Sequence, residues 1–206
     1  MSNTTRERII DEAMHLFSER GYATTSVARI EEAAGLTAGA GGLYHHFKSK
    51  EAVLAAGIER QLSRLDALRD IRLMFTPLGD LRAELILVAR YILAELDSES
   101  ELLRILATEA RSRPKLLTKA VDQLVNSTFQ GFATWIAERA ERPMPEVSPT
   151  TIATLGLGSL LSSRLLRDVF GVPSPVDDEA LVDGWVRLMM GALCDPASEP
   201  PGVDGR

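Results

Sequence analysis

The sequence predicts an all-α protein, in which a three-helix N-terminal helix-turn-helix head is joined to a helical body, with about nine helices in all. Apolar residues recur at spacings of three and four through most of the 206 residues. Gly, Pro, Ser or Thr interrupts these runs where helix caps are expected. No segment shows the sustained alternation of apolar and polar residues that is typical of strands.

The composition is that of a soluble globular protein, with 45% hydrophobic and 25% charged residues. The first 60 residues are nearly balanced in charge, so most of the net charge of −6 lies in the rest of the chain. An acidic body with a less acidic head is compatible with DNA binding but does not establish it.

The expected location is the cytoplasm. Cys194 is the single cysteine, which excludes an intramolecular disulfide and suits a reducing compartment; we expect it to be a small apolar residue on the last helix. We find neither a secretory signal pattern nor an apolar run of about 20 residues, so no membrane association is expected.

Three short helices are expected in the head. The first covers residues 6–20 and is stopped by Gly21. Thr25 or Ser26 can cap the second, which Gly35 ends. Thr37 can cap a third, whose Leu43 and Phe47 return to the apolar side. Six further helices are expected after the head. We expect them over residues 49–73 (capped by Ser49), 81–96, 101–110, 114–141, 149–170 (capped by Ser148) and 177–194.

The expected domains are a DNA-binding head over residues 1–48, a ligand-binding and dimerisation body over 49–194, and a flexible tail over 195–206. The helix over residues 49–73 would begin in the head and end in the body. Such a shared rigid element is what coupling between the two domains requires.

An ordered set of residues in the head carries a family resemblance. It consists of Ile10, Ala13, Leu16, Phe17, Gly21, Tyr22, Thr25, Ile30, Ala34, Gly35, Leu36, Thr37, Leu43, Tyr44, His45, His46, Phe47, Lys50 and Glu51. This set resembles the N-terminal domain of the TetR (tetracycline-repressor-like) transcriptional regulators over roughly residues 5–55. The rest of the chain resembles the family only in its length and helical pattern.

The sequence departs from the family pattern at two places. Thr37 and Leu43 lie six residues apart, whereas the family has four, so two residues are inserted in the recognition segment. Glu31 stands where the family usually has Ala, and we expect its carboxylate to lie outward or to alter slightly how the two helices meet.

The resemblance implies that the second helix of the motif enters the major groove of DNA. Candidate DNA-binding residues are Thr25, Ser26, Arg29, Thr37, Ala38, Gly39, Ala40, Gly41, Tyr44, His45 and Lys50. By resemblance, Thr25 or Ser26, together with Tyr44 and Lys50, would contact phosphates. The alternative for Tyr44 is that its ring covers the core of the head.

Base reading is expected to be unusual, because residues 38–42 have no hydrogen-bonding side chain. Thr37, Tyr44, His45 and Arg29 are the expected polar contacts. Ala38 and Ala40 would meet thymine methyl groups, and the glycines would let the backbone approach. Three glycines in one turn predict a helix that is frayed until DNA orders it.

Catalytic and metal sites are not expected. His45 and His46 have no acidic or cysteine partners at ligand spacing. We see no nucleophile with its base and no phosphate loop on a strand. The chain is therefore not expected to be an enzyme or to hold a cofactor.

The family has an effector pocket in the body. The candidates are Met74, Phe75, Arg90, Tyr91, Glu109, Arg113, Phe129, Phe132 and Trp135, and they favour an apolar or aromatic ligand. The alternatives are plain core packing and, for Glu109 and Arg113, an exposed i,i+4 ion pair.

The last two helices are expected to form half of a symmetric four-helix dimer interface, through small residues on one and an apolar stripe on the other. The candidates are Ala153, Gly156, Ser159, Ser163, Leu181, Gly184, Trp185, Leu188 and Ala192. The alternative is an ordinary core within one chain.

The function expected from the resemblance is that of a homodimeric, ligand-responsive transcriptional regulator. It would be a repressor that a small-molecule effector releases from a palindromic double-stranded DNA operator. The alternative is a small-molecule sensor or carrier without specific operator binding, which the recognition segment's lack of polar side chains suggests.

Overall fold

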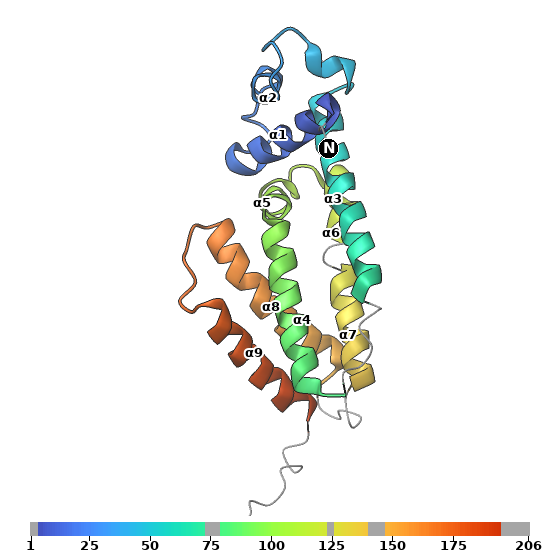
Figure 1. Cartoon of the computed structure of the whole chain (residues 1–206), viewed down its shortest axis with the longest axis vertical. Helices are drawn as coiled ribbons and strands as arrows, with labels where there is room; N and C mark the ends of the chain where they lie inside the picture. The colour runs from blue at the N-terminus through green and yellow to red at the C-terminus, as the bar shows by residue number, and fades with distance from the viewer. Residues whose placement is uncertain (1–3, 73–78, 123–125, 140–146, 195–206) are drawn as a thin grey trace, which may run out of the picture. The chain divides into compact units, whose positions relative to one another are not determined.

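A computed structural model describes residues 4–72, 79–122, 126–139 and 147–194. These residues form nine α-helices and one 3-10 helix, and no strand lies among them (Figure 1), so the predicted all-α fold is confirmed. The elements are α1 (Thr5–Arg20), α2 (Val27–Ala33), η1 (Gly42–His45), α3 (Lys50–Arg72), α4 (Leu81–Ser98), α5 (Ser100–Glu109), α6 (Pro114–Val121), α7 (Ser127–Arg139), α8 (Pro149–Asp168) and α9 (Asp178–Leu193).

Most predicted helices are confirmed within a few residues. The helix predicted over residues 114–141 is described as two, α6 and α7, and residues 123–125 between them lie outside the described part. The predicted tail, residues 195–206, also lies outside it. Within the described part, no helix has the length and apolar character needed to cross a membrane.

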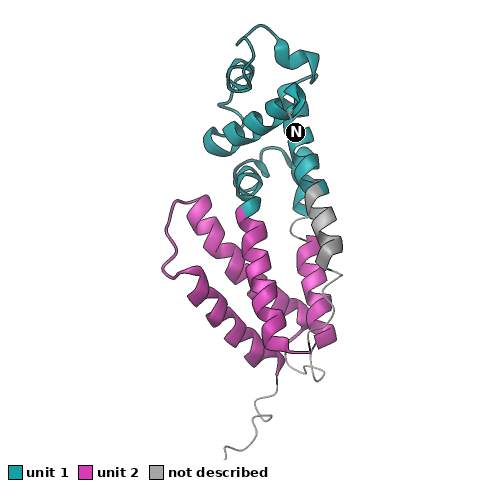
Figure 2. Ribbon diagram, viewed as in Figure 1, with its two compact units in different colours: residues 1–74, 98–125 teal, residues 75–97, 126–206 magenta. Residues whose placement is uncertain are grey.

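The chain divides into two compact units (Figure 2). Unit 1 comprises residues 1–74 and 98–125, and unit 2 comprises residues 75–97 and 126–206. The predicted head therefore shares a unit with α3, α5 and α6. The domain boundary predicted after residue 48 falls inside unit 1 and stays a prediction.

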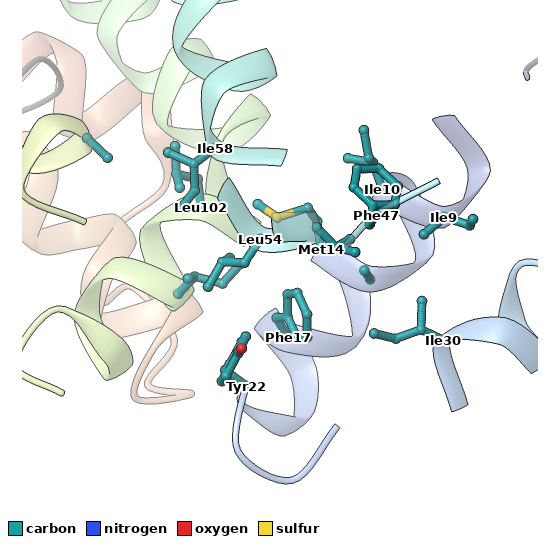
Figure 3. Close-up of a cluster of buried hydrophobic side chains, with 14 of the residues drawn as sticks. Ile9, Ile10, Met14, Phe17, Tyr22, Ile30, Phe47, Leu54, Ile58 and Leu102 are labelled. Carbon is teal, nitrogen blue, oxygen red and sulfur yellow. The ribbon is translucent and has the colours of Figure 1, made fainter. Parts of the chain in front are cut away.

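Unit 1 is built around the apolar face of α1. Its side chains Ile9, Met14 and Phe17 are almost completely buried. Figure 3 shows them among side chains that converge from α2, α3 and α5, with Met14 facing Leu54 on α3. This shared core packs α1, α3 and α5 against one another.

Caps fix the ends of several helices. Thr4 and Glu7 form a capping box at the start of α1, in which the Glu7 carboxylate accepts from the Thr4 N–H at 2.8 Å. The predicted caps are confirmed for Ser49, whose Oγ accepts from Ala52 N at 3.1 Å, and for Ser148, which accepts from Thr151 N at 3.1 Å.

Helices α1 and α3 approach each other closely at Gly57. A Cβ atom placed there would lie 2.6 Å from Met14 Cγ, far inside van der Waals contact. The glycine is thus required by packing, since any larger residue would displace a fully buried side chain.

Replacing Gly57 by Ala should lower the stability of unit 1 by about 1 to 3 kcal/mol, because the new methyl group overpacks the core at Met14. The measurement is chemical denaturation. The matched control is Gly131→Ala on α7, where the added Cβ meets nothing within 4 Å and should stabilise its helix by about 1 kcal/mol. Equal effects at the two sites would contradict this account of Gly57.

Unit 2 packs α4, α7, α8 and α9 around a second core. Trp185 of α9 is 3% exposed, and its ring stacks against the ring of Phe132 on α7, with the two ring centroids 6.1 Å apart. Its Nε1–H donates to the Gly156 carbonyl of α8 at 2.8 Å. The indole is therefore both packed and hydrogen-bonded, as a buried tryptophan requires.

A buried guanidinium ties three helices of unit 2 together. Arg164 on α8 is 2% exposed, and it donates to both carboxylate oxygens of Asp97 on α4 and of Asp178 on α9, at 2.7 to 3.0 Å. Hydrogen bonding from Arg164 lowers the pKa of Asp178 below its ordinary value. The sequence pattern does not reveal this residue, because periodicity marks a helix face but not a charge buried beneath it.

The low pKa of Asp178 makes part of the stability depend on pH. A carboxyl group whose pKa is lower in the folded state than in the unfolded state contributes its full stabilisation above the unfolded-state pKa, about 3.9. This contribution to the folded state is lost as the pH falls through the folded-state pKa. Asp178→Asn should therefore flatten the fall in unfolding free energy below about pH 4. Because Asp178 is more than half exposed, the difference should not exceed about 1 kcal/mol. The free energy of unfolding is measured by denaturant titration of the wild type and of Asp178→Asn at a series of pH values. The same dependence on pH in both proteins would contradict the prediction.

Candidate functional site

The helix-turn-helix region begins with α2, which Ser26 caps. The Ser26 Oγ accepts from Arg29 N at 3.3 Å. Thr25, the other candidate, is completely buried, and its hydroxyl donates to the carbonyls of Gly21 at 2.9 Å and Leu16 at 3.2 Å. Ser26 is exposed and available to a ligand, whereas the predicted phosphate contact of the Thr25 hydroxyl is contradicted.

The predicted third helix, capped by Thr37, is wrong. Residues 38–41 form turns, and a single 3-10 turn, η1, follows. Gly39 and Gly41 have φ values of 74° and 79°, in the left-handed region that an α-helix does not contain. The glycines therefore do not fray a helix; they build a loop.

Glu31 organises this loop. Its side chain is 0% exposed. One carboxylate oxygen accepts from Gly39 N at 2.7 Å and the other from Leu43 N at 2.9 Å. Of the two alternatives expected for this carboxylate, the outward one is wrong, because the carboxylate is buried beneath two backbone N–H groups of the loop. The signal in the sequence was the pairing of an unusual acid with an insertion.

Lys50 also points inward. Its Nζ donates to the carbonyls of Tyr22 and Thr25, both at 2.7 Å, and lies 4.1 Å from the centroid of the Tyr22 ring. Burial, and then the nearby Arg113, lower the pKa of Lys50. Its ammonium holds the chain between α1 and α2, so the predicted phosphate role is contradicted for this side chain.

Glu109 and Arg113, predicted as effector anchors, lie in unit 1 beside Tyr22. The Glu109 carboxylate accepts from Tyr22 N at 3.3 Å, and the Arg113 guanidinium carbon lies 3.8 Å from the centroid of the Tyr22 ring. Burial raises the pKa of Tyr22. These contacts bind the end of α1 to the α5–α6 junction, which is a structural role.

The remaining DNA-binding candidates gather on the surface of one short segment. Ser26, Arg29, Thr37, Ala38, Gly39, Ala40, Tyr44 and His45 are exposed, and Gly41 is half-buried. Tyr44 is 57% exposed, so its ring does not cover the core. The structure thus brings hydroxyl, imidazole and guanidinium groups to the outside of α2, the loop and η1.

The other effector candidates belong to unit 2 or to undescribed residues. Met74 and Phe75 lie outside the described residues. Arg90 is exposed and pairs with Glu179 at 2.9 Å. The rings of Phe132 and Trp135 stack with centroids 5.6 Å apart, while Tyr91 and Phe129 are half-buried. Phe132 and Trp135 are therefore neighbours within unit 2.

Three of the predicted dimer residues belong to the core of unit 2. Ala153 is 0% exposed, a Cβ at Gly156 would lie 3.0 Å from Met189 Sδ, and Trp185 is buried as described above. For these three, the alternative of an intrachain core is correct. Leu181 and Ser163 are half-buried, and the exposed members are Ser159, Gly184, Leu188 and Ala192.

An apolar face nevertheless remains on α8 and α9. Leu188 is 75% exposed, and Leu155, which the sequence analysis did not single out, is 68% exposed. Small residues lie one helical turn away, Ser159 from Leu155 and both Gly184 and Ala192 from Leu188. Exposed aliphatic side chains on neighbouring helices are candidates for contact with another protein.

The described residues contain no cluster of three or more His, Cys, Asp or Glu side chains that could hold a metal ion. His15, the histidine outside the loop region, bonds Glu101 of α5 at 3.0 Å.

Comparison with known proteins supports a regulatory role. Residues 9–56 match the family model of bacterial regulatory proteins, tetR family. Over 46 residues the chain is 50% identical to the HTH-type transcriptional regulator AcrR of Shigella flexneri, covering 22% of this chain and 20% of that protein. The matches to five such relatives span only 19% to 32% of each relative's length.

Two similarities extend over nearly the whole chain. The HTH-type transcriptional regulator UidR of Escherichia coli (strain K12) is 27% identical over 203 residues, 92% of each protein. The structure of the transcriptional regulator FadR from Bacillus subtilis in complex with stearoyl-CoA superposes with a TM-score of 0.65. The identity there is 17%, with 91% of this chain and 98% of that one covered, which shows a shared fold.

Proposed function

Because the chain belongs to the tetR family of bacterial regulatory proteins, we propose that it is a homodimeric repressor that a small-molecule effector releases from a palindromic DNA operator. The observation that carries the proposal is the set of exposed polar side chains between Ser26 and His45, in a head that matches the family model. Two copies would place their heads in successive major grooves, about 34 Å apart. The protein would act in the cytoplasm, where its DNA lies.

Phosphate contacts are assigned to the Ser26, Thr37 and Tyr44 hydroxyls and to the Arg29 guanidinium, all of which are exposed. Arg29 is the strongest candidate among them, because a charged donor gains most from a phosphate. His45 would contact a base edge or a phosphate from η1. Methyl groups of Ala38 and Ala40 would meet thymine.

Arg29→Ala should weaken DNA binding about tenfold and reduce the salt dependence of log K by about one, since one phosphate contact is lost. The measurement is fluorescence anisotropy, over a salt series, with duplexes covering the DNA beside the protein's own coding region. Arg90→Ala is the charge-matched control, because Arg90 is exposed in unit 2. An unchanged salt slope for Arg29→Ala would remove Arg29 from the interface.

The dimer is proposed to form through the exposed apolar face of α8 and α9. Leu155, Leu188, Gly184 and Ala192 would meet their counterparts around a two-fold axis, with the small residues allowing close helix approach. The core residues Ala153, Gly156 and Trp185 support this face from beneath.

Leu188→Glu should turn the dimer into a monomer, since a charge would be buried at the centre of an apolar contact. Sedimentation velocity at micromolar concentration measures the mass. Leu87→Glu, at a leucine on α4 that is 47% exposed, is the matched control and should leave the mass unchanged. A wild-type monomer, or a dimer in both variants, would rule out this interface.

The effector is proposed to be apolar or aromatic and to bind in unit 2 near Tyr91, Phe129, Phe132 and Trp135, whose rings suit such a ligand. A long-chain acyl thioester is one compound of this kind, and FadR from Bacillus subtilis has the same fold with stearoyl-CoA bound. In the anisotropy assay, stearoyl-CoA tests this class directly. Release of DNA supports it, and a complex that is unaffected excludes this compound.

The alternative function is a small-molecule sensor or carrier without specific operator binding. The residues between Thr37 and Leu43 favour it, because they have no hydrogen-bonding side chain to read bases. Binding that is absent, or independent of both salt and sequence, would support this alternative.

A further inference from the structure

We infer that Glu31 is the positioning residue of the DNA-reading segment: its buried carboxylate holds residues 37–43 as a loop, and this loop meets DNA in place of a recognition helix. The inference rests on the proposed DNA-binding function, since it concerns how the same surface is built.

The carboxylate is anchored where solvent cannot replace its partners. Glu31 is 0% exposed, and a buried carboxyl group without hydrogen bonds would strongly destabilise the fold. Each of its oxygens has one backbone donor, Gly39 N at 2.7 Å and Leu43 N at 2.9 Å. These donors lie eight and twelve residues along the chain, so one side chain fixes the loop both at Gly39 and at its last residue.

The loop conformation agrees with this anchoring and not with a distorted helix. Gly39 and Gly41 have positive φ values, which only glycine adopts without strain. A Cβ at Gly42 would lie 3.3 Å from Leu36 Cδ1, so the chain also passes close to the core there. Leu43 is completely buried and ends the loop.

This arrangement determines which groups can meet DNA. The N–H groups of Gly39 and Leu43 are occupied by Glu31, so they are not free to bind phosphates. What faces outward is the Thr37 hydroxyl, the methyl groups of Ala38 and Ala40, and the side chain of Tyr44. The position of these groups depends on Glu31, although Glu31 itself cannot touch DNA.

The first experiment measures the anchor directly. Amide hydrogen exchange of Gly39 and Leu43 is followed by NMR in the whole protein, in the wild type and in the Glu31→Gln and Glu31→Ala variants. Both amides should exchange about tenfold faster or more in Glu31→Ala, because bonds to a buried carboxylate are lost. Glu31→Gln keeps one acceptor, so the effect should be smaller. Glu32→Ala, at the exposed neighbouring acid, is the control and should change neither amide.

The second experiment measures recognition. The wild type, Glu31→Gln and Glu32→Ala are each used to select from a pool of duplexes with a randomised central region, and the recovered sequences are tested by anisotropy. We expect the wild type and Glu32→Ala to recover one motif, whereas Glu31→Gln should bind that motif about tenfold more weakly and select it less sharply.

The outcomes separate the two proposals. If the wild type recovers no motif, the proposed function is wrong, and the inference falls with it. If the wild type recovers a motif and Glu31→Gln recovers the same motif with equal affinity while its amides exchange faster, DNA binding stands and the positioning role of Glu31 is overturned. Unchanged amide exchange in Glu31→Ala overturns the inference regardless of DNA binding.

Discussion

A carboxyl group that is removed from water must find hydrogen-bond donors inside the protein, and at Glu31 this constraint shapes the exposed loop of unit 1. At Glu31 the donors come from the backbone of the following segment, so that segment folds over the carboxylate and cannot continue as a helix. The two inserted residues supply the extra chain length that the segment needs to fold over the Glu31 carboxylate. An irregular stretch of the sequence is therefore a well-determined part of the structure, as long as its buried acid is present.

Other polar groups act in the same way. Lys50 and Thr25 hold the chain between α1 and α2 by binding backbone carbonyls from inside. Arg164 joins α4, α8 and α9 through two carboxylates. Lys50 and Thr25 thus satisfy backbone carbonyls in the connection between two helices, whereas Arg164 satisfies, and is satisfied by, two side-chain carboxylates. Residues of this kind are easily mistaken for ligand contacts, because their residue types are those that binding sites use.

Helix positions and the core of the head could be predicted from the sequence, because the spacing of Ile9, Met14 and Phe17 follows directly from burial against α3. The loop at Gly39 could not, because its backbone conformation depends on a tertiary contact with Glu31. Trp185 shows a second limit: periodicity marks an apolar face but does not say whether the same chain or a second copy covers it. Its hydrogen bond to Gly156 places it in the core, while Leu188, one turn along the same helix, faces outward.

In the loop, the residues that hold the backbone are different from the residues whose side chains face solvent, and this difference is useful for protein engineering. Thr37, Ala38 and Ala40 are exposed, and their side chains take no part in holding the backbone, which is secured by Glu31, the glycines and Leu43. These three positions can therefore be varied as a combinatorial library on a constant scaffold. On the proposed DNA-binding function, the loop is an exchangeable element for engineering regulators that recognise different operators.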